Sequence, residues 1–408
     1  MSAVRVRFAA LLWVWLPATA GAGVFNYNNI LVGERPSGMG GAYTAVSDDP
    51  AGLYYNPAGI VYASNNSLSA SVNAYHTGTK TITGALFNSA DWERHSAVLM
   101  PNFFGVTQKL GPGTFGFSYA VPDAVSENQD QTVVNPLPGY SKYLINFNDS
   151  DRTYNFGPSY AIELTPGLSL GMTLYYYYRQ SETILNEILV TSDGNPRWTN
   201  SYTQRSENGV RPVLGLMWAP RPQVSVGLSL SQASDFKARR QRQTTTVGAA
   251  SVSSPFQFPA GGNFEDDYRP YHPIVTALGV AVFPSKTLLI SGDVVHYQPV
   301  GDLVDTTNPV TNFALGAEYY LYSNIALRAG VYTNYSAELE GFAAAGESRE
   351  HTDYFGGSLS ISRFTRNSSI SFGLVGSRGQ GAFWHADGRI LDVSAHTLTV
   401  FLASSYSY

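Results

Sequence analysis

Residues 33–60 read GERPSGMGGAYTAVSDDPAGLYYNPAGI, and this segment decides how the rest of the chain is interpreted. It is rich in Gly, Ala and Pro and has no long apolar run, so it fits neither a long helix nor a ladder of strands. Gly38 and Gly40 permit backbone turns that other residues adopt only at a cost. Pro50 and Pro57 fix φ and remove hydrogen-bond donors, which interrupts regular structure nearby. We therefore predict a compact, irregular, plug-like segment.

Two tight turns are expected within this plug-like segment. Asp-Pro and Asn-Pro steps favour turns, because the side chain before the proline bonds its own backbone and the proline presets φ. The residues concerned are Asp48, Asp49, Asn56, Pro57, Ala58 and Gly59.

The composition is that of an unusual protein surface. Of 408 residues, 44% are hydrophobic and only 13% are charged, whereas soluble domains carry about 25% charged residues. The mean hydropathy is nevertheless only -0.11, so apolar residues are interleaved with polar ones instead of forming blocks. This excludes a helical membrane protein, which needs about 20 consecutive apolar residues per span. It suits a membrane β-barrel, whose strands alternate between apolar and polar residues.

The two ends of the chain agree with a barrel. Residues 1–20 combine Arg5 and Arg7 with an apolar run and an Ala-Thr-Ala step, which predicts a secretory signal peptide; a membrane anchor is the alternative. Residues 396–408 alternate and end on Tyr408, like the terminal strand by which the barrel-assembly machinery recognises outer-membrane proteins. An ordinary amphipathic edge strand is the alternative there.

Between these ends the chain is predicted to consist of about fourteen strands. Short turns at 111–113, 165–167, 220–222, 284–286, 322–324 and 364–367 alternate with longer polar connections near 78–95, 122–151, 191–197, 246–267, 299–310, 336–351 and 379–393. A transmembrane antiparallel barrel sorts its connections in this way, because turns at one end are short and loops at the other are long. A soluble sandwich has no such reason. The fold class is therefore all-β, with a hatch at 21–62 and a barrel at 63–408.

A signal peptide, a Gly-rich segment ending SDDPAGLYYNPAGI and about fourteen strands together resemble the FadL family of outer-membrane transporters. In that family a short N-terminal hatch plugs the lumen and carries an Asn-Pro-Ala motif, which Asn56, Pro57 and Ala58 match. The resemblance implies passive uptake of hydrophobic molecules, such as long-chain fatty acids or related hydrocarbons, in the outer membrane of a Gram-negative bacterium. Related barrels of the PorV type carry similar segments, so a secretion or surface-assembly component is the alternative.

The family's lateral opening lies at the third strand. Here that strand is expected at 114–121, and Gly116 and Pro122 would weaken its pairing, so we place the opening beside them; a normal short strand is the alternative. Further candidates for the ligand path are Phe103 and Phe104 on the second strand. Leu137, Tyr140 and Tyr143 in the loop after the third strand are also candidates, because exposed apolar residues suit a hydrophobic ligand. Packing between loops explains the loop residues equally well.

Rare charges are expected to face the lumen. Alternation turns Asp293, Glu318 and Arg328 inward, and the turn at 322–324 sets Glu318 opposite Arg328. A charged wall suits a clamp for the hatch better than a path for an apolar ligand, so we favour anchoring over ion conduction.

Other functions find little support in the sequence. The net charge of -5 argues against nucleic acid as a partner. The seven histidines have no zinc-site spacing, and Cys is absent. We therefore expect no enzyme activity, cofactor or metal, and as partners a hydrophobic ligand, outer-membrane lipid and, during biogenesis, the barrel-assembly machinery.

Overall fold

The computed structural model describes residues 26–63, 66–248, 257–301, 306–341, 348–385 and 387–408. The predicted signal peptide lies outside these residues. Helical segments in the described part are short: α1 (Glu34–Gly38), α2 (Gly52–Tyr55), η1 (Pro57–Tyr62) and η2 (Phe87–Ser89). None of these helices is long and apolar enough to cross a membrane.

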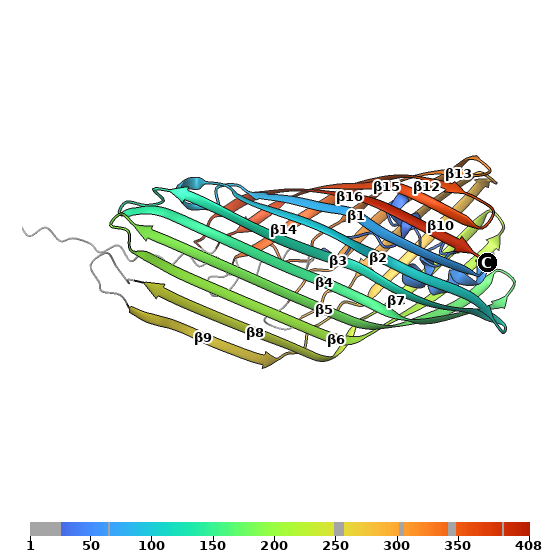
Figure 1. The fold of residues 1–408 in the computed structure, drawn as a ribbon. Coiled ribbons are helices and arrows are strands. Elements are labelled where there is room, and N and C mark those ends of the chain that lie inside the picture. Colours follow the sequence, from blue (N-terminus) through green and yellow to red (C-terminus); the bar gives the residue numbers. More distant parts are fainter. Residues whose placement is uncertain (1–25, 64–65, 249–256, 302–305, 342–347, 386) are drawn as a thin grey trace, which may run out of the picture.

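The rest of the described chain is almost entirely strand (Figure 1). The strands are β1 (Ser67–Ile82), β2 (Trp92–Leu110), β3 (Gly113–Val134), β4 (Tyr140–Thr165), β5 (Leu168–Thr191), β6 (Pro196–Arg221), β7 (Val224–Ser231), β8 (Ser234–Gly248), β9 (Gln257–Asp267), β10 (Val275–Ser285), β11 (Leu288–Tyr297), β12 (Val310–Tyr322), β13 (Ile325–Asn334), β14 (Arg349–Phe364), β15 (Ser368–Trp384) and β16 (Ile390–Ser407).

The strands close into an antiparallel barrel with fourteen positions. The ring runs β1 to β7 and then β10 to β16, and β1 pairs with β16 to close it. The other two strands, β8 and β9, extend the barrel strands β7 and β10. Strand β8 follows β7 and pairs with the far half of β6, while β9 precedes β10 and pairs with β8. The predicted fourteen-stranded barrel is therefore confirmed, although its seventh and eighth positions are each split in two.

Several connections predicted to be long are strand instead. Within 122–151, only 135–139 lie between β3 and β4, and the predicted loops at 78–95 and 379–393 are shortened in the same way. The expected single strand at 224–245 is split between β7 and β8, and β9 occupies part of the predicted loop at 246–267. The prediction failed because the outward positions turn polar beyond the apolar belt, while apolar residues such as Phe147 face inward, so the alternation typical of the belt does not continue.

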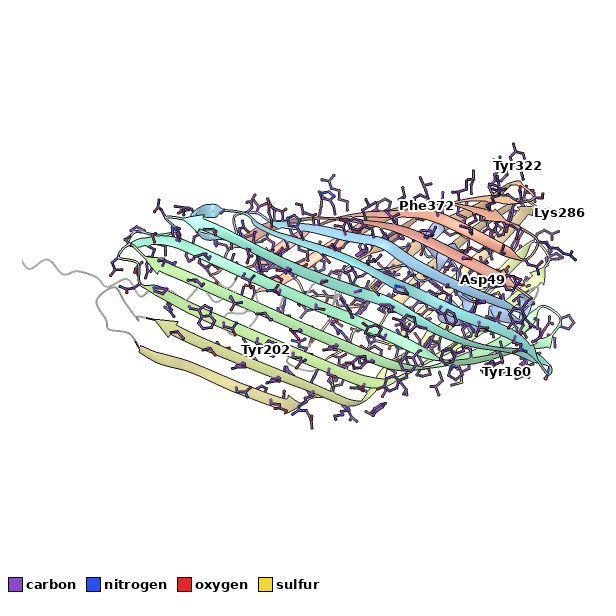
Figure 2. All side chains as sticks on the ribbon, in the orientation of Figure 1. Asp49, Tyr160, Tyr202, Lys286, Tyr322 and Phe372 are labelled. Carbon is purple, nitrogen blue, oxygen red and sulfur yellow. The ribbon has the colours of Figure 1, made fainter. Side chains whose placement is uncertain are left out.

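An apolar belt surrounds the half of the barrel that carries the short turns. On β4 the outward positions Phe156, Tyr160 and Leu164 are exposed and apolar. Further along the same strand, Arg152 and Asn148 occupy outward positions. Figure 2 shows Tyr160 and Phe372 on the outer surface of this half. Such a belt is the surface that a barrel presents to lipid.

The wall is much taller on one side than on the other. Strand β4 has 26 residues, whereas β13 has 10. On the tall side, the far end of the barrel is filled by an apolar core that includes Trp92, Phe147 and Phe383. The hatch lies inside the opposite, short-turn end, as the blue segment in Figure 1 shows. A chamber remains between the hatch and this far apolar core.

Candidate ligand chamber and hatch

Asn56 joins three segments of the molecule at the centre of the hatch. Its Oδ1 accepts a hydrogen bond from the Ala58 amide at 3.2 Å, which caps η1. Its Nδ2 donates to the carbonyl of Thr44 at 2.8 Å and to that of Leu216 on β6 at 3.1 Å. Pro57 begins η1, where its missing N–H costs nothing. The Asn-Pro-Ala motif therefore fixes the hatch to itself and to the barrel wall.

Two acidic residues of the hatch have different surroundings. Asp48 forms an ion pair with Arg35 at 2.5 Å. Asp49 accepts a hydrogen bond from the Ala51 amide at 2.8 Å. Burial raises the pKa of Asp49 to about 6, even though the nearby Arg35 guanidinium lowers it. Figure 2 places Asp49 at the same end of the molecule as Lys286 and Tyr322.

All three predicted lumen charges lie against the hatch or its partners. Glu318 accepts two hydrogen bonds from Arg35, at 2.9 and 2.8 Å, and one from Arg328 at 2.5 Å. Glu318 and Arg328 are directly opposite in the β12–β13 pairing, as the alternation predicted. The Asp293 carboxylate accepts from the backbone amides of Tyr43 at 2.8 Å and Thr44 at 2.7 Å. The carboxylates of Asp293 and Glu318 and the guanidinium of Arg328 are thus buried between the wall and the hatch.

The chamber above the hatch has a volume of about 740 Å³ and a wall of mixed apolar and polar residues. Arg211 lies 5.0 Å above the ring of Tyr54 from α2 and donates a 3.4 Å hydrogen bond to Ser231. No ion pair in the described part of the chain involves Arg211, whose titratable neighbours are the tyrosines Tyr54, Tyr175 and Tyr297. Asn155 is fully buried on β4, and neither side-chain polar atom has a hydrogen-bond partner among the described residues. The chamber therefore offers a cationic group and an unused amide.

The barrel wall is interrupted between β2 and β3. The two strands pair at Phe103–Ala120 and again at Ser96–Glu127, but not across 97–102 and 121–126 between them. The register is the same on both sides, because seven positions separate the paired residues on each strand. In that register Pro101 stands opposite Pro122, and neither residue has an N–H to donate. Facing prolines thus explain the loss of pairing.

The segment leading into the hatch closes this interruption from inside. The Ile30 amide donates to the Pro122 carbonyl at 3.1 Å, and Asn29 Nδ2 donates to Asp123 Oδ1 at 3.1 Å. The side chain of Ile30 is 5% exposed and packs with Val98, Val121 and Ala124. The segment that leads into the hatch therefore contacts the interruption through the aliphatic side chain of Ile30 and the amide of Asn29.

The structure separates the predicted ligand-path residues. Strand β3 does not stop at Pro122 but continues to Val134, and Gly116 is paired on both sides, with Thr107 and Ser159. Phe103 is buried with the hatch, whereas Phe104 faces outward. Leu137 lies in the β3–β4 turn, Tyr140 begins β4, and Tyr143 is buried in the far apolar core, where its hydroxyl donates to Glu187 at 2.6 Å. Of this set, Pro122 lies within the interruption, and Phe103 forms the pairing with Ala120 that bounds it.

Sequence reasoning missed Pro101 and Ile30. A proline within each of two consecutive strands was a readable signal, because proline removes a ladder hydrogen bond. That the two prolines face each other depends on register, which strand bounds uncertain by several residues could not give. Ile30 lies outside any recognisable motif in the sequence.

Comparison with known proteins gives matches in structure only. No family model matches the chain, and no curated protein matches it. The toluene transporter TodX of P. putida has a TM-score of 0.64 at 15% identity, covering 92% of this chain and 98% of its own. The chain has the fold of the FadL-type channels. A FadL homologue of Pseudomonas aeruginosa (TM-score 0.62, 11% identity) covers 94% of this chain and 99% of its own.

A third FadL-type structure gives the same picture. The toluene transporter TbuX of Ralstonia pickettii has a TM-score of 0.59 at 14% identity, covering 94% of this chain and 99% of its own. The resemblance to FadL-type barrels expected from the hatch segment is thus confirmed as a likeness of fold. Two of these neighbours, TodX and TbuX, are toluene transporters.

Proposed function

We propose that this FadL-type barrel carries hydrophobic small molecules passively across the outer membrane of a Gram-negative bacterium. The observation that carries the proposal is a chamber of about 740 Å³, sealed below by the hatch and lying beside an interruption in the wall. A sealed base blocks free diffusion through the lumen. A side opening within reach of lipid gives an apolar molecule another way out.

Release is proposed to occur sideways, between β2 and β3. An apolar molecule gains about 0.8 kcal/mol for each CH₂ group that it buries, so release into lipid is far cheaper than release into water. The interruption lies level with Tyr119 and Tyr154, whose rings are 6.3 Å apart at the upper edge of the apolar belt. Movement of Ile30 would open it, which couples release to the segment that leads into the hatch.

The mixture of apolar and polar groups in the chamber favours an amphiphile over a plain hydrocarbon. The guanidinium of Arg211 and the amide of Asn155 suit a carboxylate. Three strand spacings, or about 14 Å along the wall, separate β6 with Arg211 from β3 with Pro122. A fatty acid bound with its carboxylate at Arg211 would direct its tail towards the apolar residues around Ile30.

The test is uptake of labelled oleate, with toluene alongside, by cells that lack their own transporter and express this barrel. We expect oleate uptake to rise with expression and to fall severalfold in Arg211→Gln, with toluene uptake unchanged by that substitution. Absence of uptake of either compound by a folded barrel in the outer membrane would refute transport. Equal loss of both compounds in Arg211→Gln would refute the carboxylate role while leaving transport intact.

The route is tested by joining β2 to β3. Because the chain has no Cys, a Val98→Cys/Val125→Cys pair forms the only possible disulfide. The register sets these residues opposite each other inside the interruption. The matched control is Phe104→Cys/Tyr119→Cys, which joins the same strands where they are already paired. Oxidation should stop uptake in the first variant and not in the second; the same uptake in both would refute the lateral route.

Location in the outer membrane would also give the protein two partners, lipid and the assembly machinery. The apolar belt would contact outer-membrane lipid, and the terminal strand β16 would be read by the barrel-assembly machinery. An interaction barrel of the PorV type remains the competing function. It would be favoured by a folded barrel that takes up no ligand and binds a protein at its tall, polar outer wall.

A further inference from the structure

Three side chains that can bind a metal converge where the seventh and eighth barrel strands are broken. Glu207 lies on β6, Asp235 is the second residue of β8, and His272 belongs to the connection between β9 and β10. Their potential ligand atoms all lie within 4.8 Å of one another. Residues 65 positions apart in the chain thus meet at one point beside the chamber, which Glu207 and His272 line.

The guanidinium that approaches the cluster is that of Arg179, and it is held mainly by another carboxylate. Arg179 is engaged by Asp151 through two hydrogen bonds of 3.0 and 2.5 Å and approaches Glu207 only to 3.9 Å. Glu207 and Asp235 thus bring two further carboxylates to one point beside an imidazole. Carboxylate and imidazole groups are ligands of a divalent cation.

One carboxylate oxygen in the cluster is buried without a partner. The Asp235 side chain is 2% exposed, and its Oδ2 is bonded to His272 Nε2. Its Oδ1 is also buried and has no hydrogen-bond partner in the part of the chain that the structure describes. Leaving a buried charged oxygen unpaired is costly, so an orphaned carboxylate oxygen inside a set of potential ligands points to a bound cation.

The surrounding residues hold the three groups in place. Tyr177 and Tyr268 donate hydrogen bonds to the two Glu207 oxygens, at 3.1 and 2.6 Å. The His272 ring packs edge-on against Tyr177 at 5.3 Å, and Gln232 donates to the His272 carbonyl at 3.1 Å. Supporting hydrogen bonds and packing of this kind are what orient ligands in metal sites.

We infer that Glu207, Asp235 and His272 form a binding site for a divalent transition-metal ion of the zinc type. One imidazole and two carboxylates suit such an ion better than Ca²⁺ or Mg²⁺, which prefer oxygen ligands alone. Zinc bonds to these atoms are about 2.0–2.2 Å long, so ligand atoms around zinc are at most about 4.4 Å apart. Small side-chain rotations would bring the present set into that range.

The ion would join the parts of the wall that lack continuous strand pairing. It would bind β6, the start of β8 and the connection before β10, which are the elements around the two breaks. The β8–β9 hairpin, drawn at the lower left in Figure 1, would then be held at its base. This inference does not depend on transport.

The experiment uses the full barrel purified with a chelator, freed of chelator and titrated with Zn²⁺, with Co²⁺ as a spectroscopic probe. We expect one ion per chain, a rise in melting temperature, and a Co²⁺ absorption band typical of nitrogen and oxygen ligands. His272→Gln keeps a donor for Asp235 but is a poor ligand, and Asp235→Asn keeps the size of the side chain. Each should weaken Zn²⁺ binding at least tenfold and abolish the rise in melting temperature.

The matched control is His351→Gln. His351 also contacts an aspartate, Asp353, at 3.4 Å, but lies on β14 outside the cluster. Zinc binding should be unchanged in this variant. The inference is overturned if the wild-type barrel binds no stoichiometric ion, if His272→Gln binds as tightly as wild type, or if Ca²⁺ competes on equal terms. A folded, heat-modifiable band on gels confirms that each variant is intact.

Discussion

Replacement of Glu318 by Gln should loosen the hatch and open the pore. Glu318 is 1% exposed and holds two guanidinium groups, Arg35 from the hatch and Arg328 from the wall. Removing the anion of a buried ion pair costs about 3–5 kcal/mol, because the cations remain buried without compensation. Asp48 still pairs with Arg35 at 2.5 Å, so we expect the lower figure, about 3 kcal/mol.

The lost free energy weakens the attachment of the hatch to the wall, because Arg35, which pairs with Glu318, belongs to the hatch. Each 1.4 kcal/mol is a factor of ten, so about 3 kcal/mol raises the population with a displaced hatch about a hundredfold. Single-channel recording in planar bilayers measures this population directly. Wild-type barrels should be closed nearly all the time, whereas Glu318→Gln barrels should open often.

The matched control is Glu265→Gln, which removes the same charge from an exposed pair with Arg239 on the β8–β9 hairpin. Exposed pairs contribute about 0–1 kcal/mol, so this variant should resemble wild type. The reasoning is refuted if Glu318→Gln melts within a degree or two of wild type and its pore remains closed. The anchoring role of the cluster would then have to be abandoned.

Three further predictions concern the hatch and its seat. A Cβ on Gly330 would lie 2.2 Å from a Met39 backbone atom, so Gly330→Ala should cost about 1–3 kcal/mol in thermal unfolding, whereas Gly357→Ala, whose nearest neighbour is 3.5 Å away, should be neutral. The pKa of Asp49 is raised from 3.8 to about 6, so the wild-type protein should gain stability as pH falls through 6 towards 4. Asp49→Asn should be more stable than wild type at pH 8, by at most about 3 kcal/mol. Melting curves should show that this advantage is lost at pH 4. Ile30→Ala should uncover the interruption between β2 and β3 and raise basal leakage of a hydrophobic dye from the chamber; unchanged leakage would contradict the covering role of Ile30.

The sequence was informative where local rules decide the structure. Short turns built on Gly and Pro fix hairpins, and period-two alternation fixes which face of a strand is apolar. These rules predicted the fourteen-position barrel, the compact segment before it, and the opposition of Glu318 and Arg328 across a tight turn. The hatch residues were also found because Asn-Pro and Asp-Pro steps constrain the backbone wherever they occur.

The lengths of strands and the contents of the chamber were less predictable. Beyond the apolar belt, outward residues of β4 such as Asn146 and Asn148 are polar, and the apolar residue Phe147 faces inward, so the pattern of the belt is reversed. Tyr143 was placed in a loop for this reason, although it lies in an apolar core. Residues that meet where two strands of the wall are broken, such as Asp235 and His272, leave no signature in spacing along the chain.

The sequence by itself therefore determined the class of fold, the order of its parts and the faces of its strands, because these depend on neighbouring residues and on burial in lipid or protein. Only the tertiary structure decided that Pro101 faces Pro122, that Ile30 covers the interruption they leave, and that Glu207, Asp235 and His272 converge. Each of these depends on register and on closure of the barrel, which bring together residues that are far apart in the chain.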